Sequence, residues 1–209
     1  MTNKFFLNSF FTKPTLFIAC LITAFTSLNC FGAAFIIEPG LGYKQEIIKL
    51  TDKNTKLITK LYAGAPTASL KLLLYSSTGV SLGIAGEYSK GQIELDPTVT
   101  PKPDFTHLIG SFQLGVSAMD SMKIYLGYAP TNNFEAITSS TFTGFKLSGS
   151  SYIAGIALYP FHRFGLNIQY NVSTYKEISG ANYTIGSDPA LYYDKVDSQD
   201  LSLIISYLL

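Results

Sequence analysis

The stretch that decides the fold is Asp200–Leu209, which reads DLSLIISYLL. From Leu201 to Leu209 every second residue is large and apolar or aromatic, and the residues between them include Ser202 and Ser206. Successive side chains of a β-strand point to opposite faces, so this alternation predicts a strand with one continuous apolar face. In a soluble sheet such a strand would be an aggregation-prone edge, whereas a closed barrel has no edge. The stretch therefore favours a β-barrel in a membrane.

Seven further stretches show the same alternation, most regularly between Phe164 and Ser173, where Leu166 and Ile168 oppose Asn167 and other polar residues. The sequence therefore predicts an all-β fold, an eight-stranded antiparallel up-and-down transmembrane β-barrel. We expect a bulge at Pro39, because proline donates no hydrogen bond to a ladder. The predicted strands are Ala34–Glu46, Ala65–Tyr75, Val80–Tyr88, Phe105–Ala118, Met122–Tyr128, Lys146–Tyr159, Phe164–Ser173 and Asp200–Leu209.

The connections between these strands alternate between long and short, as in outer-membrane barrels, which have long outer loops and short periplasmic turns. Polar faces should then line the lumen and apolar faces should contact lipid. The predicted long loops are Ile48–Lys60, Ser89–Asp104, Ala129–Phe145 and Glu177–Gln199. Aromatic residues near strand ends are expected to form interfacial girdles: Tyr43, Tyr75, Tyr88, Tyr128, Tyr159, Phe161 and Phe164.

The composition supports a membrane protein. Only 14% of the 209 residues are charged, against roughly 25% in ordinary soluble domains, while 47% are hydrophobic. A formal net charge of +1 excludes the concentrated basic surface that nucleic-acid binding requires. The rival architecture is a secreted β-sandwich or lipocalin-like barrel, in which the apolar faces would point inward. Its solvated faces would carry Lys and Glu, whereas the polar faces here are nearly free of charge.

Residues 1–34 have the pattern of a secretory signal, which leaves residues 35–209 as the barrel domain. Lys4 and Lys13 precede the uncharged apolar run Thr15–Leu28, and small residues follow at Gly32 and Ala34. We expect cleavage after Ala34, with cleavage after Gly32 as the alternative. A retained membrane anchor is disfavoured, because the run is shorter than the roughly 20 residues of a spanning helix.

Both cysteines of the chain, Cys20 and Cys30, fall inside this signal segment. The exported domain would therefore contain no thiol, which excludes disulfides, thiolate metal sites and cysteine nucleophiles.

Three segments resemble the small eight-stranded outer-membrane proteins, namely the OmpA transmembrane domain, OmpX, OmpW and the opacity proteins. They are the opening Glu38–Tyr43, the strand ending Tyr125–Tyr128 and the closing stretch Leu203–Leu209. The resemblance implies an integral protein of the outer membrane of a Gram-negative bacterium, in contact with lipid and lipopolysaccharide, with structural or porin-like roles. Tyr207-x-Leu209 also resembles the C-terminal signal read by the barrel-assembly machinery, with Leu in place of the usual Phe. We expect a monomer.

Four charged residues fall on the inward faces in this register: Glu38, Lys71, Glu87 and Lys123. The interior of an eight-stranded barrel is just wide enough to be filled by side chains, so buried charges there must pair or be hydrated. We expect a Glu/Lys network that plugs the lumen; the alternative is a gate along a narrow polar pathway. A wide pore is excluded, because porins need about 16 strands.

Catalysis is the remaining alternative, since lipid A deacylases and acyltransferases are also eight-stranded barrels that use His and Ser. His107 and Ser111 share a strand face but lie about 13 Å apart by strand rise, so they cannot form a dyad. His162 is expected in a periplasmic turn, and both histidines are interpreted as structural or solvated. The acidic group Asp188, Asp194, Asp197 and Asp200 matches no metal loop. We therefore expect no enzyme, cofactor or metal.

The sequence thus predicts a barrel with a structural or surface-interaction role, exerted through its long outer loops. An OmpW-like passive channel for small or hydrophobic molecules is the first alternative, and a lipid A-modifying enzyme is the second.

Overall fold

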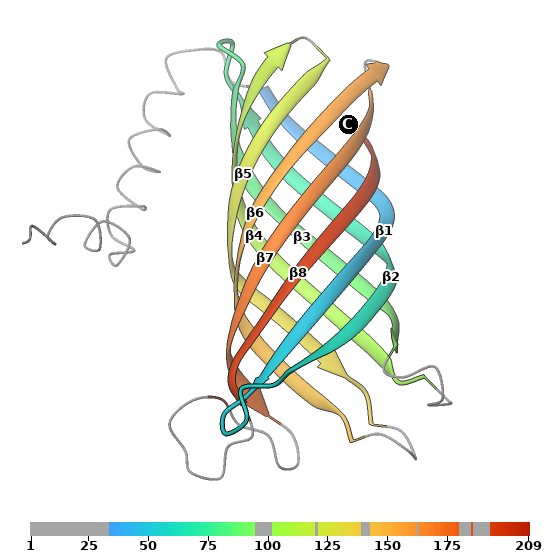
Figure 1. Cartoon of the computed structure of the whole chain (residues 1–209). Helices are drawn as coiled ribbons and strands as arrows, with labels where there is room; N and C mark the ends of the chain where they lie inside the picture. Colours follow the sequence, from blue (N-terminus) through green and yellow to red (C-terminus); the bar gives the residue numbers. More distant parts are fainter. Residues whose placement is uncertain are drawn as a thin grey trace, which may run out of the picture.

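The computed structural model describes residues 34–94, 102–119, 121–138, 143–161, 163–179, 185 and 193–209. The predicted signal segment, up to residue 33, lies outside them. The eight strands are β1 (Ala34–Asp52), β2 (Ile58–Tyr75), β3 (Val80–Glu94), β4 (Asp104–Met119), β5 (Met122–Ala136), β6 (Phe145–Phe161), β7 (Phe164–Ser179) and β8 (Tyr193–Tyr207). Each pairs antiparallel with its neighbours in sequence, and β8 pairs with β1 to close a barrel, as predicted (Figure 1). No helix in the described residues is long and apolar enough to cross a membrane.

The barrel is strongly sheared. Starting from Ile37 and moving from one paired residue to the next through all eight strands, the path returns to β1 at Ile47, ten residues further along. Such a stagger requires tilted strands, which Figure 1 shows. Neighbouring inward side chains therefore come from positions far apart in sequence, and with eight strands they fill the interior.

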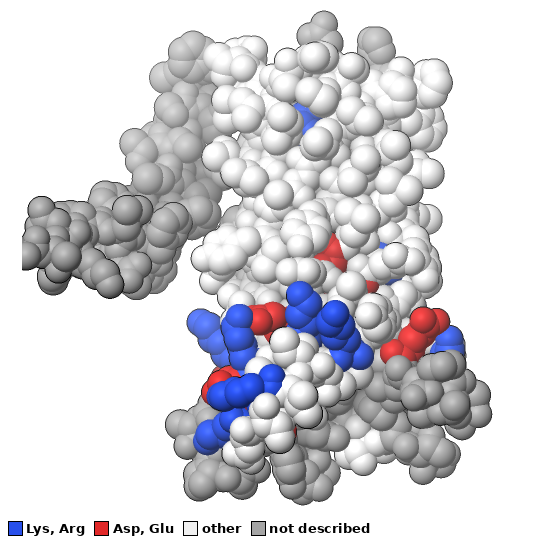
Figure 2. Space-filling view, in the orientation of Figure 1, with Lys and Arg blue, Asp and Glu red and all other residues white. Residues whose placement is uncertain are grey.

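The apolar faces point outward, as the sequence predicts. Leu41 of β1 and Leu203 of β8, which pair with Ile205 and Tyr43 across the β1–β8 seam, are 72% and 52% exposed. Glu38 and Ser202, on the opposite faces of the same strands, are buried. Figure 2 shows that Lys, Arg, Asp and Glu gather at the loop-bearing end, and that the rest of the visible surface is almost free of them. The uncharged part is a lipid belt, the surface that a membrane-spanning barrel needs.

Aromatic residues border the lipid belt, but not all those predicted. Tyr43, Tyr88 and Tyr152 are exposed toward the loop side, and Phe161 and Phe164 toward the short-turn side. The predicted girdle positions at residues 75 and 159 are wrong: both tyrosines point into the lumen, where they bond with charged residues. The reason is the strand period of two, because the tyrosines follow the buried, inward-facing Leu73 and Ala157 by two residues.

The strands extend further at the loop end than predicted. β1 continues to Asp52 and β2 begins at Ile58, so the predicted loop Ile48–Lys60 is a short hairpin between two long strands. The other long connections shrink in the same way, because β3, β5 and β7 run on to Glu94, Ala136 and Ser179 and β8 begins at Tyr193. Beyond the lipid belt the two faces exchange character: inward residues are apolar and outward ones charged. The pattern of apolar-outward alternation therefore ends before the strands do.

The predicted bulge at Pro39 is also wrong. Pro39 pairs with Leu70 of β2 without a change of register, and the pairing with β8 begins only at Gly40, so the missing proline N–H interrupts no described ladder. Register shifts occur elsewhere, for example between Gly110 and Phe112 of β4, opposite Tyr128 and Thr131.

Local hydrogen bonds close the short turn between β2 and β3 and the loop-side hairpin between β1 and β2. In the turn between β2 and β3, the N–H of Gly79 donates to the carbonyl of Ser76, and Gly79 adopts φ 81°, a conformation that favours glycine. In the β1–β2 hairpin the Asp52 carboxylate accepts hydrogen bonds from the N–H groups of Asn54 and Thr55. These bonds lower the pKa of Asp52, with the Thr55 backbone bond as the largest cause.

Candidate functional site in the lumen

The four predicted lumen charges, Glu38, Lys71, Glu87 and Lys123, all lie inside the barrel and are buried. Their hydrogen-bond partners in the described residues are neutral side chains. Asn167 links two of the charges: its amide nitrogen donates to Glu38 Oε1 at 3.0 Å, and its oxygen accepts from Lys71 Nζ at 2.8 Å. Within the described residues none of these four carboxylates and ammoniums approaches an oppositely charged member of the set to 4.0 Å.

The other two charges of this set are also held by neutral groups. Glu87 accepts a hydrogen bond of 2.6 Å from the Gln169 amide, and Lys123 donates one of 2.6 Å to the hydroxyl of Tyr75. Lys71 Nζ additionally lies 4.5 Å from the centre of the Tyr125 ring, which is a favourable cation–π distance. We call the four charges and these partners the short-turn cluster. In this cluster the charged groups contact amides and phenols instead of forming direct ion pairs with one another.

A second group of buried charges, which we call the loop-side cluster, lies nearer the loops: Lys44, Glu46, His107 and Asp200. Lys44 Nζ lies 3.7 Å from Glu46 Oε2 and 3.6 Å from Asp200 Oδ2. His107 Nδ1 lies 2.8 Å from Glu46 Oε2. All four side chains are almost completely buried, so their charges must be balanced within the cluster.

The orientation of His107 follows from its neighbour Asn132. The Asn132 amide nitrogen donates to the hydroxyls of Ser151 and Ser173, so the Asn132 oxygen is left to accept from His107 Nε2 at 2.6 Å. Nδ1 then accepts from Lys44 Nζ, 2.7 Å away, in the neutral ring, or donates to Glu46 in the charged ring. Both ring nitrogens are therefore engaged inside the barrel.

The loop-side cluster was missed by the sequence prediction, although part of its signal was visible. Lys44 shares the inward face of β1 with Glu38, and His107 lies on the polar face of β4. Glu46, however, ends one predicted strand, and Asp200 begins another while also belonging to the acidic group of residues 188–200. In the structure β8 begins at Tyr193, so Asp200 lies well inside the strand and is buried. Sequence periodicity shows which face a residue is on, but not which residues of distant strands share a level.

Between the loop-side cluster and the loops, an apolar plug fills the lumen. It contains residues from all eight strands, and stacked rings lie at its centre: Phe105 and Phe134 have centroids 4.9 Å apart, and Phe145 is 6.2 Å from Phe134. This plug was not predicted. Its buried members are Ile48, Leu50, Leu61, Ala63, Ala65, Ile93, Phe105, Phe134, Ala136, Phe145, Leu147, Tyr175, Ile178 and Val196.

The remaining candidates do not assemble into a site. Ser111 donates to the Ala85 carbonyl at 3.5 Å and makes no bond with His107. His162 and Asp188 lie outside the described residues. Asp194 pairs with Lys56 at 2.9 Å, a bond that lowers the pKa of the Asp194 carboxyl. Among the described residues no group of three or more His, Cys, Asp or Glu is placed to hold a metal ion.

No protein-family model and no curated protein matches the sequence. Solved structures do match it. Ail, the attachment invasion locus protein of Yersinia pestis, is 15% identical with a TM-score of 0.54, covering 83% of this chain and 98% of Ail. A second Ail structure, in complex with the heparin analogue sucrose octasulfate, is 16% identical with a TM-score of 0.53, and the match covers 84% of this chain and 99% of Ail. Neisserial surface protein A is 13% identical with a TM-score of 0.51, and the match covers 84% of this chain and 98% of that protein.

This chain has the fold of the small bacterial outer-membrane barrels. The predicted fold class is confirmed, and the apolar, nearly uncharged outer surface of this chain agrees with the predicted outer-membrane location. At such low identity the likeness extends to the fold alone.

Proposed function

We propose that this barrel acts at the cell surface, in a structural or binding role, and that its lumen conducts no solute. The apolar plug carries the proposal. A polar solute entering from the loops would have to cross a packed layer of hydrocarbon before reaching the buried charges below. A hydrophobic solute that passed the plug would meet two clusters of buried charge. A lumen filled in this way stabilises the barrel and does not let solutes pass. The exterior of the loop end is therefore the functional surface.

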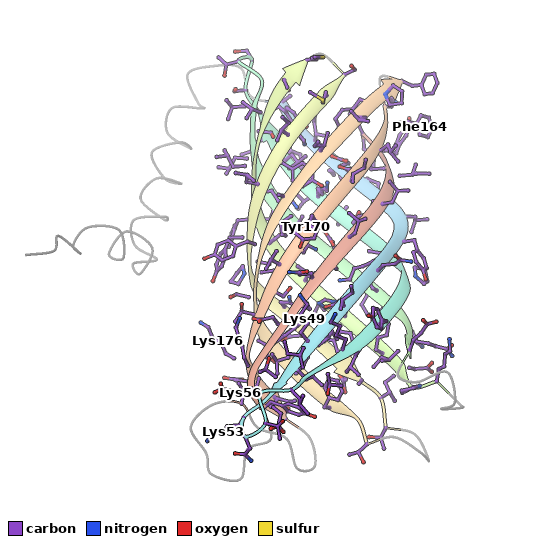
Figure 3. All side chains as sticks on the ribbon, in the orientation of Figure 1. Lys49, Lys53, Lys56, Phe164, Tyr170 and Lys176 are labelled. Carbon is purple, nitrogen blue, oxygen red and sulfur yellow. The ribbon has the colours of Figure 1, made fainter. Side chains whose placement is uncertain are left out.

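The charge on that exterior favours an anionic partner. Lys49 of β1 and Lys60 of β2 are register partners and both point outward. Asp197, the register partner of Lys49 on β8, pairs instead with Lys195 at 2.6 Å. Like charges directly opposite one another destabilise a sheet. Within the described residues no carboxylate lies within 4.0 Å of either of them, although other lysines nearby are paired. Figure 3 shows Lys49, Lys53, Lys56 and Lys176 at the loop-bearing end. A sulfated or phosphorylated polymer would offset this repulsion, and the ligand in one Ail structure, the heparin analogue sucrose octasulfate, is likewise sulfated.

Binding to heparin, as a model sulfated polymer, tests the surface role. Protein folded in liposomes should be retained on immobilised heparin and released by salt, because screening weakens such contacts. Lys49→Gln together with Lys60→Gln should lower the releasing salt concentration. Lys146→Gln is the matched control, since Lys146 is also exposed but already pairs with Glu135 at 2.8 Å. Passage of the wild type without retention would argue against an anionic partner.

The channel alternative is tested separately by single-channel recording in planar bilayers. We expect no discrete conductance steps from the wild type, with a sixteen-stranded porin as the positive control. Steps that disappear in Lys71→Ala or Glu87→Ala would establish an OmpW-like passage through the short-turn cluster and refute the sealed lumen.

The enzyme alternative predicts lipid A of altered acylation when the protein is expressed in a bacterial host, with the change lost in His107→Ala. We expect unchanged lipid A by mass spectrometry. The engagement of both His107 ring nitrogens inside the barrel supports that expectation.

A further inference from the structure

A groove of about 700 Å³ crosses the exterior of the barrel over β7, β8, β1, β2 and β3, at the loop-side margin of the lipid belt. Its lining includes three phenols and three primary amides, beside apolar and charged residues. The residues concerned are Tyr43, Tyr62, Tyr170, Gln45, Gln92 and Gln199. Tyr170, labelled in Figure 3, lies on the outer face of β7 between the short-turn end and the lysines of the loop end.

One continuous row of paired residues forms the floor of the groove. Tyr170 pairs with Leu201, Leu201 with Gln45, Gln45 with Gly64, and Gly64 with Gln92. All five residues lie on outward faces. Gly64, at the centre of this row, allows the Tyr43 side chain to lie across the floor, because a Cβ at residue 64 would be only 2.5 Å from the Tyr43 hydroxyl. The groove is therefore a consequence of register, and it follows the tilt of the barrel.

The groups in the groove are available to a ligand. Tyr43, Tyr62 and Tyr170 are between 44% and 51% exposed. In the described parts of the chain the side-chain amides of Gln45 and Gln199 have no hydrogen-bond partner, although each offers two donors and an acceptor. A phenol presents an apolar face and a polar tip. A pyranose sugar has the complementary surface, with C–H groups on its ring faces and hydroxyls around its rim.

The ends of the groove differ in character. Leu201 and Tyr170 belong to the lipid belt, whereas the far end is closed by Glu94 and Lys102, which pair at 2.7 Å. A ligand that follows the groove would place its hydrocarbon part beside the belt and its polar part beside the amides and the ion pair. We propose that this groove binds the sugar portion of a glycolipid anchored in the outer leaflet, that is, of lipopolysaccharide. The inference rests on the proposed membrane setting, but not on the sealed lumen or on the lysines.

The absence of tryptophan from the sequence provides a direct test. Tyr62→Trp places a single fluorophore in the groove and keeps an aromatic ring there. The full chain, folded into phosphatidylcholine liposomes, should show a saturable change in tryptophan emission as purified lipopolysaccharide is incorporated. The matched control is Tyr152→Trp, since Tyr152 is also exposed on the lipid belt but lies on β6, outside the groove. Its emission should not saturate with lipopolysaccharide.

The amides of Gln45 and Gln199 provide a second test of the groove. Adding Gln45→Ala and Gln199→Ala to Tyr62→Trp should raise the half-saturating fraction of lipopolysaccharide about tenfold, as expected for two lost hydrogen bonds of ordinary strength. Asn133→Ala in the same background removes an exposed amide on β5, outside the groove, and should leave the half-saturation unchanged. Heat-modifiable migration on gels verifies that each variant is folded.

Three results would overturn the inference. One is an equal response to phosphatidylglycerol, which would mean that any anionic lipid suffices. Another is an equal response to soluble core oligosaccharide without its lipid, which would mean a receptor for free glycans. The third is no response at all from folded, inserted protein. None of these results bears on heparin retention or conductance, so the proposed function stands or falls separately.

Discussion

Lys44 illustrates, at the scale of a single residue, what burial imposes on charge in this lumen. Its ammonium is balanced by two carboxylates at 3.6 and 3.7 Å and contacts a histidine nitrogen, all in a water-poor interior. Such a group adds little net stability when paired, because both partners lost their hydration. Removing one partner is costly, since the others stay buried without compensation.

Lys44→Met should therefore destabilise the barrel by about 3–5 kcal/mol, because Glu46 and Asp200 would remain as uncompensated buried carboxylates. The measurement is urea unfolding in phospholipid vesicles. Lys49→Met, at an outward-facing, half-buried lysine five residues further along β1, is the control and should change stability by less than about 0.5 kcal/mol. Equal effects of the two substitutions would mean that the loop-side cluster is solvated.

A second residue-scale prediction concerns the pH dependence of the β1–β2 hairpin. The folded-state pKa of Asp52 is lowered, so its contribution to turn stability is complete above the unfolded pKa of about 3.9. That contribution is lost as pH falls through the lower folded value. Amide hydrogen exchange at Thr55 should therefore lose protection in acid. Asp52→Asn keeps an acceptor oxygen without a titrating group and should abolish the pH dependence; an unchanged acid profile would contradict this origin.

At the scale of elements, the long strands beyond the lipid belt are the main departure from the sequence prediction. Periodicity identifies a strand by one apolar row, and here that row moves from the outer to the inner face. Ile48 and Leu50 continue β1 inside the barrel, with Lys49 between them on the outside. In sequence this exchange resembles the end of a strand followed by a lysine-rich loop. Pairing with β2 and β8 shows that the ladder continues.

Limited trypsin digestion in detergent micelles distinguishes a long loop from extended strands. Cleavage should occur after Lys53 and Lys56, in the hairpin turn, and not after Lys49 and Lys60, whose backbone is held in the β1–β2 ladder. Protein unfolded by heat should be cut at all four sites. Equal cutting of all four in the folded protein would restore the predicted loop Ile48–Lys60.

At the scale of the whole molecule, the barrel has two zones of opposite polarity. In the membrane zone charges and amides are inside and Leu, Ile and Phe are outside, as lipid requires. In the loop-side zone the apolar plug is inside and lysines are outside, as in a soluble protein. The membrane boundary therefore lies within single strands, near the tyrosine girdle.

This boundary predicts that the cost in stability of introducing an arginine on the outer face depends on its depth in the membrane. Leu203→Arg, in the lipid belt, should cost about 2–4 kcal/mol in vesicles, because an arginine near the bilayer midplane loses its hydration. Thr174→Arg, on an outward face of β7 near Asp197 in the loop-side zone, should cost less than about 0.5 kcal/mol. Similar small effects at both sites would show that the belt contacts solvent rather than lipid.

The sequence by itself determined the barrel class, the number of strands, the outward direction of the apolar rows and the burial of Glu38, Lys71, Glu87 and Lys123. These features are local, because a strand's period of two records which face each residue takes. Only the tertiary structure decided that Lys44, Glu46, His107 and Asp200 meet, that fourteen apolar residues close the lumen, and that Tyr170, Gln45 and Gln92 form one groove. The physical reason is the shear of the barrel: residues at one level come from different positions on eight tilted strands, and no short-range pattern encodes that stagger.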